Sequence, residues 1–403
     1  TYIQNRDWIG IDWELNNIKL WRQDTLDATW RYMMYDTDFA FGLYGGNIYQ
    51  NYIDKARNPS YPNQHSQIFD HILDNADFRC RFVNRYDDLI NTTFQTDHFN
   101  EVTDELKSEL APAIPDHVAN WSNQMGPSSY SYWLNAVNGI KTYNSSRIAT
   151  ARQHLNQSLS LQGQHIVDLD VFPSTAGHVK LNSIMPELPW DGVYHGACPV
   201  AAKAIPSHGF LFSHWYSTAT PYNNAVQDSI EVALSANTTL VAHFDTCKNV
   251  VDATIEQSER MLKATVSIAV SNPSYEWLYN GTLVSTDSVI YNPLDGNYQL
   301  TVRFDSCEIQ SETFVVNQGD YGIHLFPNPA VEALTVQFLM GQQENLSLGI
   351  YNTAGQLVWE TTYSQFLGQF NGTIDVSDFA RDLYILRITT PSQAYAEKFI
   401  LVD

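Results

Sequence analysis

Oxygen-donor side chains gather in the first forty residues of the chain. Asp7, Asp12 and Asn17 lie in one short stretch, and Asp36 and Asp38 follow a run of aromatic and apolar residues. Phosphoryl transfer needs a carboxylate that orients the acceptor hydroxyl, and Asn and Asp oxygens that hold Mg²⁺ on the phosphates. Asp12 and Asn17 also have the spacing of the protein-kinase Asp-x-x-x-x-Asn pattern. These residues fit Mg²⁺-dependent phosphoryl transfer, although an Asp-x-Asp pair taken alone is more often a turn or a calcium loop.

Other kinds of site have less support in the sequence. Neither Gly-x-Ser-x-Gly nor His-Glu-x-x-His occurs, so nothing argues for a hydrolase. His65, His71, His98 and His117 lie far apart without ligand spacing, and we expect them to be structural or exposed. A formal net charge of -22 argues against nucleic-acid binding, which needs clustered Lys and Arg.

The elements that carry the acidic residues are mixed, and mostly helical after residue 40. Aromatic and apolar residues over 30–39 predict a strand that runs into the two carboxylates of the Asp-x-Asp pair. Apolar residues recur at helical spacing in four later segments, namely 68–82, 82–94, 102–110 and 133–143. We therefore expect residues 1–155 to form a mainly helical α+β domain.

The pattern changes after about residue 156, where short alternating runs separated by turn residues predict strands. The expected fold is multidomain, with three all-β modules after the α+β domain. We predict a small β-repeat module over residues 156–248. Residues 249–318 contain a central Trp277 and the hairpin dipeptide at 280–281, and predict an immunoglobulin-like sandwich. Residues 319–403 predict a further small sandwich.

Cysteine usage and the termini bear on the cellular compartment. Cys247 and Cys307 have similar local patterns, Phe-Asp-Thr-Cys and Phe-Asp-Ser-Cys. The sequence leaves open whether these two cysteines form a disulfide. No apolar stretch approaches the ~20 residues of a transmembrane helix, so no transmembrane segment is expected. The chain starts at Thr1 without a signal peptide, and we expect it to be a piece of a longer precursor.

Separated motifs of the first 155 residues occur in the order typical of one family. They are Asn-Arg-Asp-Trp at 5–8, Asn-Asn-Ile-Lys-Leu-Trp at 16–21, Asp-Thr-Asp-Phe-Ala-Phe-Gly at 36–42, and two segments at 78–94 and 115–121. Together they resemble the CotH kinase-like family, named for spore coat protein H. The resemblance implies a kinase-like fold with Mg²⁺ and ATP as cofactors.

The resemblance also assigns roles to residues. It implies two catalytic candidates, Asp7 and its rival Asp12, two cofactor-binding residues, Asn17 and Lys19, and three metal ligands, Asn17, Asp36 and Asp38. A salt bridge from Asp7 to Arg22 or Arg31 is the structural alternative. A kinase also needs an N-terminal lobe with a phosphate-covering loop and a Lys, and the stretch before Asp7 is too short for it. We therefore expect residues 1–155 to be the C-terminal part of such a domain.

The last eighty or so residues carry a second resemblance. Phe-Pro-Asn-Pro at 326–329, Ile-Tyr-Asn-Thr-Ala-Gly-Gln-Leu-Val at 350–358 and Lys-Phe-Ile-Leu-Val at 398–402 occur together. This combination resembles the C-terminal sorting domain of type IX secretion in Bacteroidota. It implies that residues 319–403 engage the type IX machinery and that the protein is secreted or displayed outside the outer membrane. The structural alternative is a generic C-terminal sandwich of an adhesin.

The two resemblances lead to two hypotheses about function. The first is an exported CotH-like kinase that transfers phosphate from a nucleotide to a protein or other hydroxyl acceptor. The alternative is a non-catalytic binding, adhesin or structural protein of the cell surface that uses a kinase-like fold. The residue types at 7, 17, 36 and 38 favour the first reading, and the scarcity of ATP outside the cell favours the second.

Overall fold

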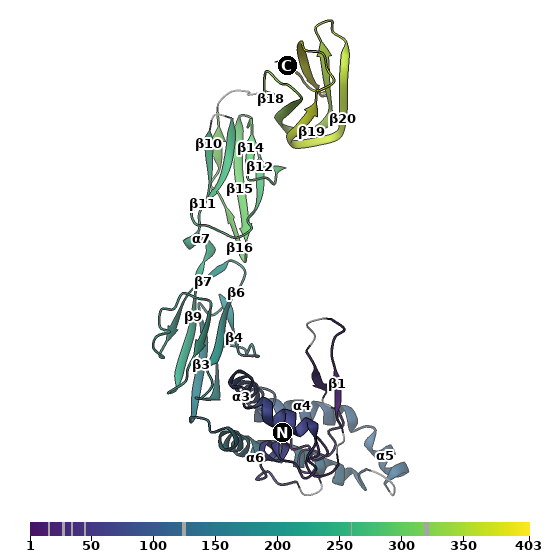
Figure 1. Ribbon diagram of the computed structural model, residues 1–403, viewed down its shortest axis with the longest axis vertical. Helices are drawn as coiled ribbons and strands as arrows, with labels where there is room; N and C mark the ends of the chain where they lie inside the picture. The colour runs from purple at the N-terminus through teal and green to yellow at the C-terminus, as the bar shows by residue number, and fades with distance from the viewer. Residues whose placement is uncertain are drawn as a thin grey trace. The chain divides into compact units, whose positions relative to one another are not determined.

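Figure 1 shows the computed structural model of the chain, with helices followed by a series of β-sheets. The structure describes residues 1–14, 17–25, 29–33, 35–43, 46–122, 126–258, 260–317 and 322–403. These residues form two compact units, one of residues 1–205 and 212–244 and the other of residues 206–211 and 245–403. The expected order, helices first and β-structure afterwards, is present.

Helices dominate the described residues from 52 to 159. They are α1 (Tyr52–Arg57), α2 (Gln64–Ile72), α3 (Ala76–Asn91), α4 (Thr96–Leu110), α5 (Ile114–Trp121) and α6 (Tyr130–Leu159). The single helix predicted over 68–82 is wrong, because α2 ends at Ile72 and a new helix starts at Ala76. Asn75 causes the break, since its side chain accepts a hydrogen bond from the amide of Phe78 and caps α3.

The strand predicted over 30–39 is much shorter in the structure. Only β2 (Arg31–Met33) forms, and it pairs antiparallel with β1 (Lys19–Trp21) in an exposed hairpin. Met34 lies outside the described residues. Asp36 has a φ of 48°, a left-handed conformation that a strand cannot contain. The prediction was therefore wrong beyond β2, because aromatic and apolar residue types alone do not show whether the backbone is extended.

Residues 164–246 form two facing sheets. One sheet has the order β5 (Trp190–His195), β3 (Gln164–Phe172), β9 (Thr238–Thr246), β7 (Phe210–Ser217). The other sheet has the order β4 (Gly177–Leu181), β6 (Val200–Pro206), β8 (Ser229–Val232). Burial alternates along β4 and β6, as expected when one face of each strand packs inward. Trp215 is fully buried between them, and its indole nitrogen donates to the carbonyl of Gln227.

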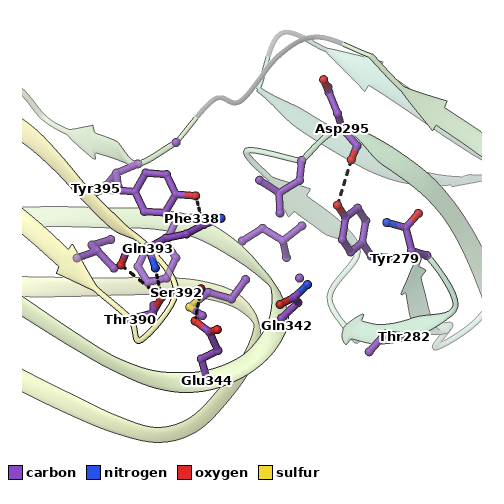
Figure 2. A pocket seen from close by; sticks show the side chains of 18 residues that line it. Tyr279, Thr282, Asp295, Phe338, Gln342, Glu344, Thr390, Ser392, Gln393 and Tyr395 are labelled. Carbon is purple, nitrogen blue, oxygen red and sulfur yellow. Dashed lines mark hydrogen bonds between the residues drawn. The ribbon is translucent and has the colours of Figure 1, made fainter.

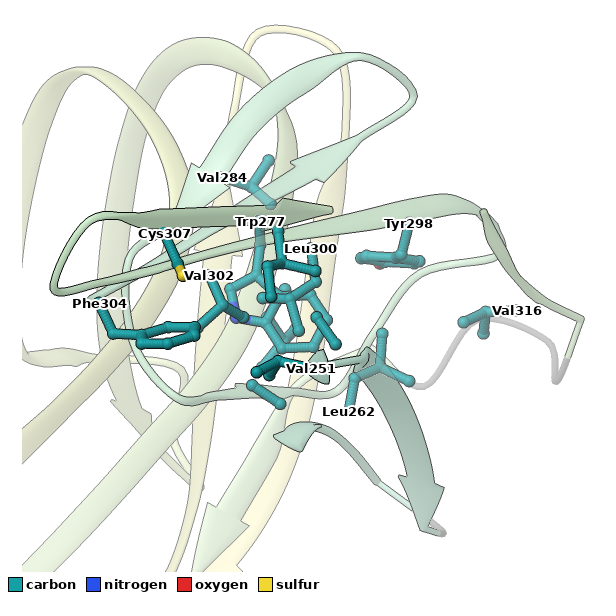
Figure 3. Close-up of a cluster of buried hydrophobic side chains, with 14 of the residues drawn as sticks. Val251, Leu262, Trp277, Val284, Tyr298, Leu300, Val302, Phe304, Cys307 and Val316 are labelled. Carbon is teal, nitrogen blue, oxygen red and sulfur yellow. The ribbon is translucent and has the colours of Figure 1, made fainter. Parts of the chain in front are cut away.

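Residues 247–316 form a second sandwich. A short helix, α7 (Cys247–Val250), precedes two sheets. The first has the order β10 (Ala253–Ser258), β11 (Met261–Val266), β14 (Val289–Tyr291). The second has the order β13 (Thr282–Ser285), β12 (Ser274–Tyr279), β15 (Gly296–Phe304), β16 (Cys307–Gln310), and β17 (Phe314–Val316) also pairs with β15. Trp277 is fully buried at its centre (Figure 3), and its indole donates to the carbonyl of Asp287. Asn280 and Gly281, with φ of 47° and 84°, make the predicted tight hairpin turn. A disulfide joins Cys247 to Cys307, so this pairing occurs.

Residues 324–400 form the last sheet. Its order is β18 (His324–Phe326), β19 (Ala333–Asn352), β21 (Leu383–Thr389), β22 (Ala394–Ile400), with β20 (Leu357–Asp375) also paired to β19. Leu339 of β19 joins the hydrophobic core that contains Trp277, and Asn292 donates to the carbonyl of Gln337. A cavity of about 660 Å³ lies between the second sandwich and this last sheet (Figure 2). Hydrogen bonds from Thr390 and Ser392 in its wall lower the pKa of Glu344.

Candidate functional site

Three of the predicted site residues meet around the side chain of Asn17. Its amide nitrogen donates to Oδ2 of Asp7 at 2.9 Å and to the backbone carbonyl of Asp36 at 3.4 Å. Asn17 and Asp36 have φ values of 51° and 48°, in the left-handed region that Asn and Asp adopt more readily than other residues. The turns at these two positions thus bring together residues that are 10 and 19 positions apart in sequence.

Asn5 supports the same arrangement, although it was not among the predicted site residues. Its amide nitrogen donates to the carbonyl of Asp36 at 3.1 Å, and its amide oxygen accepts from the backbone N–H of Asp7 at 3.1 Å. Asn5 is therefore a second link between the two acidic segments. The signal for it was present in the Asn-x-Asp spacing at 5–7, which the sequence reasoning used only as part of a motif.

Carboxylates crowd at the exposed edge of this cluster. A hydrogen bond with the side chain of Asp38, together with some burial and the charges of Asp38 and Asp7, raises the pKa of Asp36. Two carboxylates close enough to share a proton repel each other once both are ionised. A bound cation would relieve this repulsion, so the donor set fits a divalent ion.

The candidate ligands are an amide and two carboxylates. No group of three or more His, Cys, Asp or Glu side chains able to hold a metal ion occurs among the residues that the structure describes. Mg²⁺ in phosphoryl-transfer sites usually takes one or two carboxylates and completes its coordination with water and phosphate oxygens. Asn17, Asp36 and Asp38 are the residues that would hold a cation in such an open site.

Asp12 lies in a different environment. Its Oδ2 accepts from Nε of Arg6 and its Oδ1 from Nζ of Lys55, both at 2.8 Å. Burial opposes ionisation of Asp12, but the hydrogen bonds from Lys55 and Arg6 outweigh it and lower the pKa of the carboxyl. Both oxygens are thus held by cations of this chain, which suits a structural role better than contact with a substrate.

Replacing Asp12 by Asn should lower the free energy of unfolding by about 1 kcal/mol at pH 7, because both ion pairs are partly exposed. A lowered pKa in the folded state means that the pairs stabilise the fold above the unfolded-state pKa of about 3.9. The difference between the two proteins should therefore shrink as the pH falls below that value. Urea denaturation at pH 7 and pH 3 measures both effects, and an unchanged difference at pH 3 would contradict this account.

The remaining cationic residues of this region stack on aromatic rings. Lys19, predicted to bind the cofactor, is exposed on β1, and its Nζ lies 3.5 Å from the ring centre of Tyr35. Arg22 and Arg31, the predicted alternative partners of Asp7, lie over the rings of Trp30 and Trp21. These contacts place the cations along the hairpin.

A mainly apolar cavity of about 540 Å³ adjoins the acidic cluster. Asn5 and Thr37 line the part next to the carboxylates, and Tyr35 of the segment after β2 and Phe82 of α3 line its apolar wall. Arg81 and Arg85 of α3 also line it. Neither arginine was among the predicted site residues.

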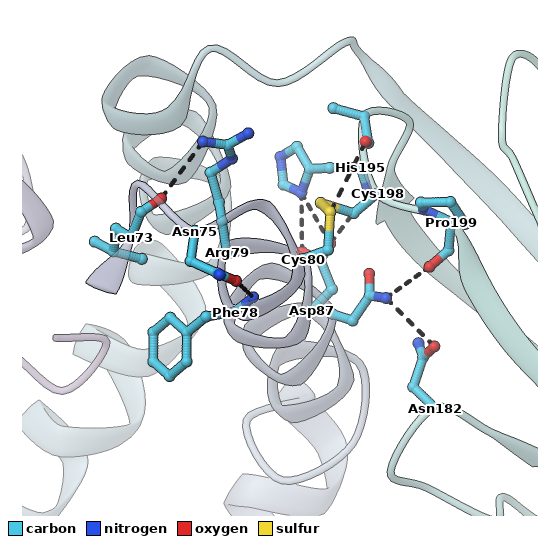
Figure 4. Close-up of a disulfide and its surroundings, with 12 residues drawn as sticks. Leu73, Asn75, Phe78, Arg79, Cys80, Asp87, Asn182, His195, Cys198 and Pro199 are labelled. Atoms are coloured by element: carbon cyan, nitrogen blue, oxygen red, sulfur yellow. Dashed lines mark hydrogen bonds and ion pairs between the residues drawn. A yellow bond between two sulfur atoms is a disulfide. The ribbon is translucent and has the colours of Figure 1, made fainter. Parts of the chain in front are cut away.

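α3 is fixed by a buried polar network with the first β-sandwich (Figure 4). His195 of β5 contacts both carboxylate oxygens of Asp87 through Nδ1, at 3.0 and 2.9 Å, and neither side chain is exposed. The next residue, Asp88, accepts from the hydroxyl of Tyr194 at 2.8 Å. The Cys80–Cys198 disulfide closes the same contact. The helix that lines the cavity is thereby tied to a sheet about a hundred residues later.

Comparisons with known families agree with this organisation. Residues 1–150 match the family model described as CotH kinase protein, and residues 324–402 match the secretion system C-terminal sorting domain. Both resemblances are confirmed. The sorting domain marks an exported protein, secreted or held at the cell surface. No helix of the described residues is long and apolar enough to cross a membrane.

Comparisons with individual proteins add little. A search of curated proteins found no match. Among solved structures, dimeric latent PorU from Porphyromonas gingivalis is 12% identical, with 60% of this chain and 30% of that chain covered and a TM-score of 0.18. Chicken CNTN1 FN1–FN3 is 10% identical, with 51% and 94% covered and a TM-score of 0.17. The S-layer protein rSbsC(31-844) is 9% identical, with 88% and 68% covered and a TM-score of 0.16. At these TM-scores and sequence identities, the three structures do not indicate a fold or a function for this chain.

Proposed function

We propose that the CotH segment takes part in Mg²⁺-dependent phosphoryl transfer from a nucleotide to a hydroxyl acceptor outside the cell. Asp7 orients the acceptor hydroxyl, and Asn17, Asp36 and Asp38 bind Mg²⁺. The sorting domain delivers this segment through the type IX machinery to the exterior of the outer membrane. Both proposals rest on the family matches at the two ends of the chain.

The observation that carries the proposal is the double hydrogen bond of Asn17. Its amide nitrogen reaches both the Asp7 carboxylate and the Asp36 carbonyl. A carboxylate for the acceptor and an Asn and an Asp for the metal are the parts that phosphoryl transfer requires in one place. Since the amide nitrogen faces Asp7, the amide oxygen is the atom of Asn17 that could bind a cation.

The metal would neutralise phosphate charge during transfer. The chain's own residues do the rest. Asp7 accepts a hydrogen bond from the acceptor hydroxyl and holds it toward the phosphate, and Asn5 and Asn17 fix the position of Asp7. A hydrogen bond with Asp38, followed by the charges of Asp38 and Asp7, raises the pKa of Asp36, and a bound cation would offset the repulsion between these carboxylates.

The test is calorimetric titration of MgATP into the full-length natural protein and into its Asp36→Ala/Asp38→Ala variant. We expect binding that requires Mg²⁺ and that the double variant weakens by at least about a hundredfold, since two ligands of the ion are lost. Asp24→Ala/Glu14→Ala removes the same charge outside the proposed ligand set and should bind MgATP as the natural protein does. Absence of Mg²⁺-dependent binding in the natural protein would overturn the proposal in favour of a displayed, non-catalytic domain.

A further inference from the structure

An apolar groove runs between α4 and α6, on residues that the acidic site does not use. Its volume is about 480 Å³. The apolar residues in its wall are Phe99, Val102, Leu106 and Leu110 of α4 and Trp133, Val137 and Ile140 of α6. Leu106 and Leu110 are 53% and 54% exposed, and no residue of α4 is buried. Apolar side chains that remain exposed along a groove mark an interaction site.

The spacing of the row identifies the shape of its partner. The α4 residues follow an i, i+3, i+7, i+11 pattern, and those of α6 an i, i+4, i+7 pattern. Each row therefore follows one face of its helix, and both rows line the groove. A groove of this kind accepts a third helix that inserts apolar side chains at the same helical spacing.

A row of acidic residues accompanies the apolar row. Glu101, Glu105 and Glu109 are exposed and directly precede the groove residues Val102, Leu106 and Leu110. The glutamates thus recur every four residues, one beside each of three of the four apolar α4 positions. A partner helix with Lys or Arg beside its apolar anchors would complement this pattern.

Lys107 of α4 also lines the groove, but it does not make the net charge along the α4 edge of the groove positive. Nζ of Lys107 pairs with Oδ1 of Asp104, and Lys141 of α6 pairs with the second oxygen of the same carboxylate. These pairs tie α4 to α6 and leave the three glutamates to set the charge of that edge.

We propose that the groove between α4 and α6 is a docking site for a basic amphipathic helix of another protein. Apolar side chains of that helix fill the space between Leu106 and Trp133, and its cations lie along the three glutamates. This proposal does not depend on phosphoryl transfer, because it uses neither Mg²⁺ nor any residue of the acidic site.

Two fluorescent peptides of leucine and lysine, each as long as α4, test the proposal by anisotropy titration. One has its leucines at i, i+3, i+7 and i+11, and the other has the same composition in scrambled order. Because the chain has a net charge of -22, the scrambled peptide measures non-specific attraction. We expect the patterned peptide to bind the full chain at least about tenfold more tightly, a difference of about 1.4 kcal/mol.

Variants separate the apolar and acidic contributions. Leu106→Asp should abolish the preference for the patterned peptide, whereas Ile68→Asp on α2 should keep it, since Ile68 is also 53% exposed. Glu101→Gln/Glu105→Gln/Glu109→Gln should weaken binding about tenfold and reduce its salt dependence. Circular dichroism checks that each variant is folded, and Val102→Asp is a second groove variant if Leu106→Asp unfolds.

Three results would overturn the proposal. One is equal binding of the two peptides, and another is an unchanged preference in both groove variants. The third is self-association of the natural protein in gel filtration that Leu106→Asp removes, since a second copy would then occupy the groove.

Discussion

Replacing Asp7 by Asn should reduce phosphoryl transfer by at least about a hundredfold while leaving the affinity for MgATP within about threefold. The amide has the size of the carboxylate, and its oxygen can still accept the hydrogen bond that Asn17 now donates to Asp7 at 2.9 Å. It can no longer accept a proton from the acceptor hydroxyl. The position of the site is kept and only the chemistry is lost.

The measurement uses labelled ATP to follow transfer to acceptor protein or to the chain itself, with calorimetry for affinity. Asp12→Asn is the matched control, because Asp12 contacts Arg6 and Lys55 and not Asn17. Transfer at the natural rate by Asp7→Asn, together with a large loss in Asp12→Asn, would reverse the two roles. A loss of MgATP affinity in Asp7→Asn would instead make Asp7 a metal ligand.

Replacing Asp87 by Ala should lower the free energy of unfolding by about 3–5 kcal/mol. Asp87 and His195 are both fully buried, and the imidazole contacts both carboxylate oxygens. Burial raises the pKa of Asp87, and the hydrogen bonds from His195 only partly oppose this. Removing the carboxylate leaves the imidazole and the backbone N–H of His195 without the partner that they now have.

Chemical denaturation followed by circular dichroism measures this loss. Asp77→Ala is the control, since Asp77 is exposed in the first turn of the same helix and should cost no more than about 1 kcal/mol. Similar losses in the two variants would show that the Asp87–His195 contact adds little to stability. A large loss confined to Asp87→Ala would show that the contact between α3 and the first sandwich stabilises the fold.

That contact bears on function through α3. The same helix lines the apolar cavity beside the acidic cluster with Phe82 and Arg85. It is held from its other side by Asp88, Asn91 and the Cys80–Cys198 disulfide. The β-sandwich over 164–246 therefore acts as a support for the wall of the candidate site.

Local patterns in the sequence determined much of this protein. The order of helices and strands, the tight turn at Asn280 and Gly281 and the two family motifs depend on residues close together in the chain. The oxygen-donor side chains near the N-terminus could be named for the same reason, because residue type alone limits which ions and reactions they suit. The boundary at Asn75 was missed, although its capping side chain was visible, because an unbroken apolar pattern hid it.

Only the tertiary structure decided which of these residues meet. Asp7 and Asp12 are equivalent in residue type, yet Asp7 bonds to Asn17 and Asp12 is held by Lys55, 43 residues away. The pairing of Cys80 with Cys198 and of Asp87 with His195 likewise joins segments more than 100 residues apart. Such contacts depend on how whole elements pack, and no local pattern records the packing. The physical reason is that a side chain's neighbours in space, more than those in sequence, set its charge state and its available partners.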